Sequence, residues 1–173
     1  MDIDSILKGH GIGGGGSNIK SIQRGTTLLN ATTTNVSISA VDLTKSVVIL
    51  SVESGGSGAS FILAKGVLTT STNLELDIDA SGYCTVYWQV IEFINIKSLQ
   101  SGNKITALAS DSITISPVNL TRSVVFHSYK TSEVDTSLTF GHVGLALTTA
   151  TNISVIQYGA KNKDIQWYVV EFN

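Results

Sequence analysis

The residues with the clearest potential for chemistry are two glutamates, Glu92 and Glu171. They are the next-to-last residues of two matching stretches, 86–93 and 165–172, in which Trp, Val, Glu and Phe fall at the same places. Two carboxylates can share general acid–base work. Because both belong to a repeated pattern, the simpler interpretation is structural. Each would be a charge on the solvent face of a strand or a carboxylate that bonds a neighbouring backbone.

The histidines and the single cysteine share no motif. His10 lies in the glycine-rich start of the chain, while His127 and His142 have no histidine at the matching place in the first copy. Cys84, four residues before Trp88 on an expected strand, is predicted to be a buried structural thiol, since a nucleophilic thiol also needs a suitably placed base. The motifs G-x-S-x-G and H-E-x-x-H are absent. We therefore predict no catalytic residue and a protein that is not an enzyme.

Two short patterns resemble ligand sites. Residues 77–82 match the first half of a calcium loop, D-x-D-x-S-G, but the position that needs a bidentate glutamate is Trp88. We expect an exposed strand end running into a turn, with a weak, non-helical calcium site as the alternative. Residues 11–16 match G-x-G-x-x-G, but no strand precedes them and no βαβ pattern follows. The sequence thus predicts no metal site and no cofactor.

The chain is a tandem duplication, and this sets its domain organisation. Residues 18–23 match 95–100, and 37–48 match 114–125, both at an offset of 77. Residues 70–74 match 149–153 at an offset of 79, so the second copy has a net insertion of two residues. We predict a leader at 1–17 and two β-domains at 18–94 and 95–173.

Each copy has the sequence pattern of antiparallel strands. Apolar and polar residues alternate at 36–40, 74–79 and 86–91, as they do in half-buried strands. The apolar run 47–50 predicts a strand covered on both faces. Turn-forming clusters separate these stretches at 42–45, 54–58 and 80–82. The predicted fold is all-β, with two tandem antiparallel sandwich- or barrel-like domains, each with a core nucleated by its own Trp and Phe.

The composition limits the partners. The net charge is −2 and charged residues are only 14% of the chain, with no basic cluster that could neutralise a nucleic acid backbone. No apolar run reaches the roughly 18 residues of a membrane span. The acidic start lacks the features of a signal peptide, so we expect synthesis in a cytosol. A surface poor in charge has little to prevent association, which favours a homo-oligomer.

The leader combines a short apolar patch with a glycine run at 13–16. Glycine runs form flexible linkers. The leader is therefore either a disordered tail or a tethered anchor peptide. The anchoring residues would be Ile3, Ile6, Leu7 and Ile12.

Loops in which the two copies differ are candidates for contact surfaces, with ordinary loop drift as the alternative. Residues 24–26 differ from 101–103, and the Ser/Gly stretch 54–60 has an unlike counterpart at 132–135. The candidate contact residues are Arg24, Ser54, Ser57 and Phe61.

The opening 18–26 after a glycine-rich leader, the middle Leu68-Thr69-Thr70 and the closing 88–92 resemble small structural proteins of tailed bacteriophages. The resemblance implies a virion component, either a capsid decoration or a tail-associated protein. Such a protein is made in the host cytoplasm, contacts other capsid or tail proteins and is often a trimer. The alternative is a receptor- or glycan-binding adhesin module of a phage tail, with a host surface glycan as its ligand.

Overall fold

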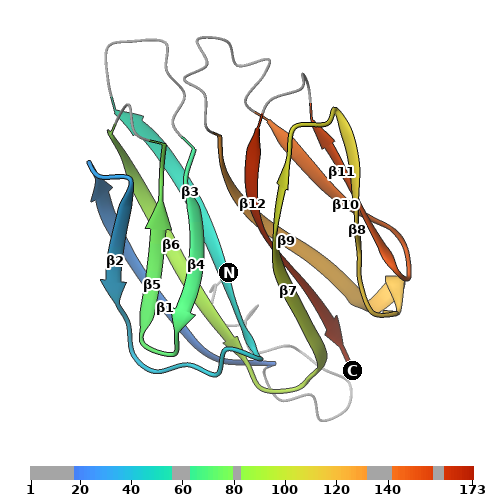
Figure 1. Cartoon of the computed structure of the whole chain (residues 1–173). Coiled ribbons are helices and arrows are strands. Elements are labelled where there is room, and N and C mark those ends of the chain that lie inside the picture. The colour runs from blue at the N-terminus through green and yellow to red at the C-terminus, as the bar shows by residue number, and fades with distance from the viewer. Residues whose placement is uncertain (1–17, 56–62, 80–82, 132–141, 158–161) are drawn as a thin grey trace, which may run out of the picture.

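The structure is a computed structural model that describes residues 18–55, 63–79, 83–131, 142–157 and 162–173 (Figure 1). The first copy contains β1 (Ile19–Leu29), β2 (Thr33–Ser37), β3 (Ser46–Gly55), β4 (Lys65–Thr70), β5 (Asn73–Asp77) and β6 (Tyr83–Phe93). The second contains β7 (Ile96–Thr106), β8 (Ser110–Thr114), β9 (Ser123–Thr131), β10 (Val143–Thr149), β11 (Asn152–Gln157) and β12 (Lys163–Phe172). A 3-10 turn, η1 (Leu120–Arg122), precedes β9.

The two copies have the same sheet topology. In the first copy the sheets have the orders β1-β6-β3 and β2-β5-β4, and in the second β7-β12-β9 and β8-β11-β10. All pairings are antiparallel, and no described strand pairs with one from the other copy. The predicted all-β fold with two duplicated domains is confirmed.

The tryptophans mark the inner faces of the sandwiches. Val86, Trp88 and Val90 are buried while Tyr87 between them is exposed, as the alternation at 86–91 predicts. Each tryptophan lies opposite a glycine of the neighbouring strand, Gly25 for Trp88 and Gly102 for Trp167. Without a side chain there, the indole ring can lie flat across that strand.

Several local predictions hold and one needs correction. Val47 and Val48 are fully buried, as expected for a strand covered on both faces, whereas Ile49 and Leu50 of the same run are half-buried. The tryptophans belong to separate cores, as predicted. The prediction that each core contains its own Phe is wrong for the second copy: Phe172 packs against the first core and not the second, edge-on to Phe93 with ring centroids 5.7 Å apart. The two copies are thus joined by side chains as well as by the chain.

The second domain presents a sheet face to the side of the first. Strands β3 and β4 at the edges of the first sandwich contact β9, and β4 also contacts β12 (Figure 1). Tyr168 and Val170 of β12 consequently belong to the first hydrophobic core. No helix within the described ranges is long and apolar enough to cross a bilayer.

Candidate functional site

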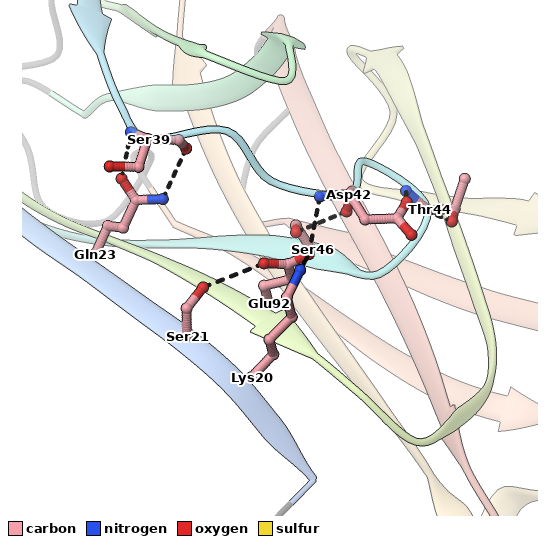
Figure 2. Close-up of polar contacts among 8 residues, drawn as sticks. All are labelled: Lys20, Ser21, Gln23, Ser39, Asp42, Thr44, Ser46 and Glu92. Atoms are coloured by element: carbon pink, nitrogen blue, oxygen red, sulfur yellow. Dashed lines mark hydrogen bonds and ion pairs between the residues drawn. The ribbon is translucent and has the colours of Figure 1, made fainter.

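The paired glutamates lie inside the fold and hold each sandwich together. Glu92 is 2% exposed, and its Oε1 accepts hydrogen bonds from Lys20 Nζ at 2.9 Å and from the backbone N–H of Asp42 at 3.0 Å. Its Oε2 accepts from Ser21 Oγ at 3.2 Å. Figure 2 shows these groups converging on the carboxylate from β1 and from the connection between β2 and β3. Glu92 therefore links the closing strand to the chain segment that crosses between the sheets.

Side-chain hydrogen bonds also hold the connection between β2 and β3 in place. Asp42 Oδ1 accepts from the N–H and the hydroxyl of Thr44 at 2.9 and 2.7 Å, and Ser46 Oγ donates to the Asp42 carbonyl at 2.7 Å. Gln23 both donates to the Ser39 carbonyl and accepts from its N–H (Figure 2). These side chains satisfy backbone groups that lie outside the hydrogen-bonded ladders of the sheets.

The second copy repeats these contacts residue for residue. Glu171 accepts from Lys97 Nζ at 2.9 Å, from the N–H of Asn119 at 3.0 Å and from Ser98 Oγ at 3.3 Å. Asn119 takes the place of Asp42, and Gln100 bonds Ser116. The polar residues that the copies share thus serve the fold. Of the two structural interpretations, backbone bonding is right and a charge on the solvent face is wrong.

We call Lys20, Ser21, Asp42 and Glu92, with their counterparts in the second copy, the clasp. The stability that the clasp contributes should depend on pH. For Glu92, burial alone would raise the pKa, but bonds from Lys20, Asp42 and Ser21 outweigh it, and the pKa is lowered; for Glu171, the Lys97 bond lowers the pKa. A depressed carboxyl pKa contributes stability that is present above the unfolded value of about 4.3 and is lost as the pH falls through the folded value.

We predict that Glu92→Gln lowers the free energy of unfolding by about 2 kcal/mol at pH 7, since hydrogen bonds to a charged group contribute about 1.5–3 kcal/mol. Urea titrations between pH 2 and 7 check this. Below pH 4 the difference between the variant and the parent should shrink. Glu53→Gln, at an exposed site, is the control and should change stability by less than about 0.5 kcal/mol. A pH-independent difference would contradict the assignment.

The other reactive side chains do not converge in the described ranges. Cys84 is fully buried, and burial raises the pKa of its thiol to about 11. His127 is part-buried on β9, stacked on Tyr129, with Nε2 3.3 Å from the Val143 carbonyl, whereas His142 is exposed. His10 lies outside the described residues. The prediction that Cys84 is buried is confirmed.

Cys84 should accordingly be inert in the native protein. We expect a thiol reagent at pH 8 to modify it at least 100-fold more slowly in buffer than in 8 M urea, because the reactive thiolate is scarce and shielded. Absorbance of the released chromophore measures both rates. Comparable rates would show that the strand end opens readily or that the thiol is exposed.

Asp77, the first residue of the stretch 77–82, belongs to an ionic cluster at the junction between the domains. The expectation of an exposed strand end is wrong for Asp77, which is 6% exposed. Asp77 accepts from Thr33 Oγ1 at 2.9 Å and lies 3.6 Å from Lys65 Nζ and 3.4 Å from Lys130 Nζ. Among the described residues no group of three or more acids, histidines or cysteines could hold a metal ion.

This junction cluster crosses from one copy to the other. Lys65 Nζ of β4 lies 2.7 Å from Asp164 Oδ2 of β12, and Lys130 of β9 reaches back to Asp77 of β5. Beside it, the N–H of Gly66 donates to Ser128 Oγ at 3.0 Å in a buried hydrogen bond. Lys65 and Asp77 have side chains at most 10% exposed. Direct ionic bonds therefore fix how β4 sits on the sheet of the second domain.

Two hollows border the junction. One, of about 420 Å³, is lined by Ile105 and by charged and polar side chains that include Lys130, Lys163 and Asp164. The other, of about 250 Å³, is lined in part by Leu43, Leu68 and Tyr168. Among the described residues that line the two hollows, no nucleophile is paired with a base.

The outer face of the β1-β6-β3 sheet is the most distinctive exposed surface in the described ranges. It carries Tyr83 and Tyr87, each about half exposed, and Leu28, exposed by 59%. The Tyr87 hydroxyl donates a hydrogen bond to Glu53 Oε2 at 2.7 Å, and Arg24 Nε donates one to Gln89 Oε1 at 3.2 Å. Tyrosine and arginine beside apolar side chains are typical of protein contact sites.

Of the predicted contact and anchor residues, the structure describes Arg24 and Ser54. Arg24 lies within β1 and not in a loop, so the predicted loop at 24–26 is wrong, although Arg24 is on this exposed face. Ser54 is near the end of β3, opposite Cys84 in β6. Ser57 and Phe61, and the anchor residues Ile3, Ile6, Leu7 and Ile12, lie outside the described residues.

Sequence reasoning missed the junction residues Lys65, Asp164 and Tyr168. A signal was present: at each of these positions the copies differ, with Gly144, Thr85 and Gln89 as the counterparts. A charge or a large side chain in only one copy indicates a contact that only that copy makes.

Comparison of the chain with known protein families, curated proteins and solved structures gave no match.

Proposed function

We propose that the chain is a non-enzymatic structural protein of a virion of the tailed bacteriophage kind, either a capsid decoration or a tail-associated protein. The observation that carries this proposal is the junction, which binds two sandwiches into one body through buried ionic and aromatic contacts. A body of fixed shape suits a component that projects from an assembly. The resemblance of the sequence to such proteins supplies the kind of assembly.

The residues with potential for chemistry are engaged in the fold, which supports a non-enzymatic role. Glu92 and Glu171 each accept hydrogen bonds from a lysine, a serine and a backbone N–H. A general acid or base must instead reach a substrate. The proposed partners are other capsid or tail proteins, and the proposed location is the virion, after synthesis in the host cytoplasm.

Particle purification tests this role. The chain should co-sediment with purified particles through a density gradient at a stoichiometry of many copies per particle. A variant lacking residues 1–16 should keep its circular dichroism spectrum and be lost from the particles, because the leader is proposed to be the anchor. Absence of the full chain from particles would contradict the virion role, and normal incorporation of the variant would contradict only the anchor.

The exposed tyrosines favour a second candidate, a receptor- or glycan-binding adhesin module of a phage tail. Tyr83 and Tyr87 are on alternate outward positions of β6, and Arg24 is on the neighbouring strand. Aromatic rings beside polar groups can bind sugars by stacking and hydrogen bonding. A glycan array probed with the full chain tests this candidate: binding lost on Tyr87→Ala would support it, and no binding would contradict it.

A further inference from the structure

The junction between the copies is heterologous, because the two domains contribute different surfaces. The first domain contributes an edge surface on β4 and β5, which includes Lys65, Gly66 and Asp77. The second contributes the outer face of its β7-β12-β9 sheet, which includes Ser128 and Asp164. Because the domains are copies, the first domain also has a sheet face like the one that the second contributes. The second domain likewise has an edge surface like the one that the first contributes. Neither of these two surfaces is used in the junction.

The unused sheet face belongs to the first domain. The outward residues of β12 are buried by the junction: Gln166 is 7% exposed and Tyr168 4%. At the matching places on β6, Tyr87 is 46% exposed and Gln89 is half-buried. β12 is thus covered on both faces, whereas its counterpart β6 is covered on one face.

The unused edge surface belongs to the second domain. Lys65 is buried on β4, whereas its counterpart Gly144 on β10 is exposed. Asp77 is 6% exposed, whereas its counterpart Ile156 on β11 is 60% exposed. An exposed isoleucine beside a strand at the edge of its sheet is an unusual surface to leave in water.

We propose that these two surfaces bind each other between copies of this chain: the β10–β11 edge surface of one chain docks on the outer face of the β1-β6-β3 sheet of the next. The proposed contact between two chains would have the same arrangement as the junction between the two domains of a single chain. Heterologous contacts generate closed rings or open filaments, according to whether the rotation closes.

The chemistry of the two surfaces has changed together. The junction pairs Lys65 with Asp164, and the corresponding places between chains are Gly144 and Thr85, both uncharged. Removing only one member would have left an unpaired charge against the partner, which is costly when buried. Ser51 keeps the hydroxyl that Ser128 uses in the junction, where it binds the N–H of Gly66.

Besides Arg24 on β1, the sheet face carries the charge of Glu53 on β3, the counterpart of Lys130, which in the junction faces Asp77. Glu53 accepts the hydroxyl hydrogen of Tyr87, so it has a partner on its own face. Between chains, Ile156 takes the place opposite Glu53. The sign of a charge placed at 156 should therefore decide whether the contact forms, which gives the proposal a specific test.

The test is sedimentation velocity of the full chain between about 1 and 200 μM. The parent should associate as its concentration rises. Ile156→Glu should weaken association at least tenfold by placing a carboxylate against Glu53, whereas Ile156→Lys should associate at least as well as the parent. Ile94→Glu changes a similarly exposed isoleucine in the turn between the copies and is the control. A parent that is monomeric throughout, or an Ile156→Glu variant that associates normally, would overturn the proposal.

A mixing experiment separates this contact from a symmetric one. Tyr87→Asp spoils the sheet face and Ile156→Glu spoils the edge surface, so each variant alone should be monomeric. A mixture retains one intact surface of each kind and should form a dimer and nothing larger. If the mixture stays monomeric while both variants keep the parent's thermal unfolding midpoint, the head-to-tail contact is wrong. The proposal does not rest on the virion role, which particle purification tests separately.

Discussion

Lys65→Met is expected to lower the free energy of unfolding by about 3 kcal/mol, because removing one partner of a buried ion pair costs about 3–5 kcal/mol. Lys65 has a 10% exposed side chain and bonds Asp164 across the junction at 2.7 Å. Lys65 bonds Asp164 Oδ2, and Asp164 Oδ1 has no hydrogen-bond partner in the described part of the chain, so the carboxylate would lose its cation and remain mostly buried. Asp77 would keep Lys130.

Chemical denaturation and a double-mutant cycle measure this effect. Lys65→Met combined with Asp164→Leu should recover most of the loss, since the uncompensated charge is gone. Lys104→Met, which removes the Lys104–Asp111 pair within the second domain, is the matched control and should cost about 1 kcal/mol, because the side chain of Lys104 is 29% exposed whereas that of Lys65 is 10% exposed. Equal costs for Lys65→Met and Lys104→Met would show that the junction pair is not special.

Gly25→Ala is expected to cost about 3 kcal/mol, at the upper end of the 1–3 kcal/mol typical of overpacking. A Cβ at Gly25 would lie 2.6 Å from Trp88 Cε2 and closer still to Cζ2. The indole cannot retreat freely, because its Nε1 donates to Thr27 Oγ1 at 3.1 Å and the ring is 9% exposed. Either the ring turns and loses this bond or β1 separates from β6.

The second copy supplies a graded comparison. At Gly102 a Cβ would lie 2.8 Å from Trp167 Cζ2, a milder overlap, so Gly102→Ala should cost roughly 1–2 kcal/mol. Urea denaturation followed by fluorescence measures both. The chain has only two tryptophans, so Trp88→Phe and Trp167→Phe parents report each domain alone. A neutral Gly25→Ala would mean that the strand pairing around Trp88 differs from the register described.

The class of fold was predictable because its signals are local. The alternation at 86–91 places Trp88 inward and Tyr87 outward, and the structure confirms both. Repetition of polar residues also carried information, since Glu92 and Glu171 have equivalent backbone partners. The alternation of polar and apolar residues cannot predict that Glu92 binds the backbone of Asp42, because Asp42 is 50 residues away in the sequence.

The junction could not be predicted from local patterns. The alternation at 74–79 assigns Asp77 to an exposed row, yet Lys65 and Lys130 bury it, and Lys130 comes from the other copy. Tyr168 likewise falls in an outward row and is buried by the first domain. The packing of one domain on another depends on complementary surfaces brought together by the whole chain. Differences between the copies, such as Lys65 against Gly144, were the only sequence signal of it.

The most direct test of the account is electron cryomicroscopy of purified particles from cells that express this chain. We predict a regular array of paired sandwiches on the capsid or tail, with the tyrosine-bearing outer face of β1-β6-β3 covered by the β10–β11 edge of a neighbouring copy. Particles with no density for the chain would contradict the proposed virion role. An array in which that face points into solvent would contradict the head-to-tail contact.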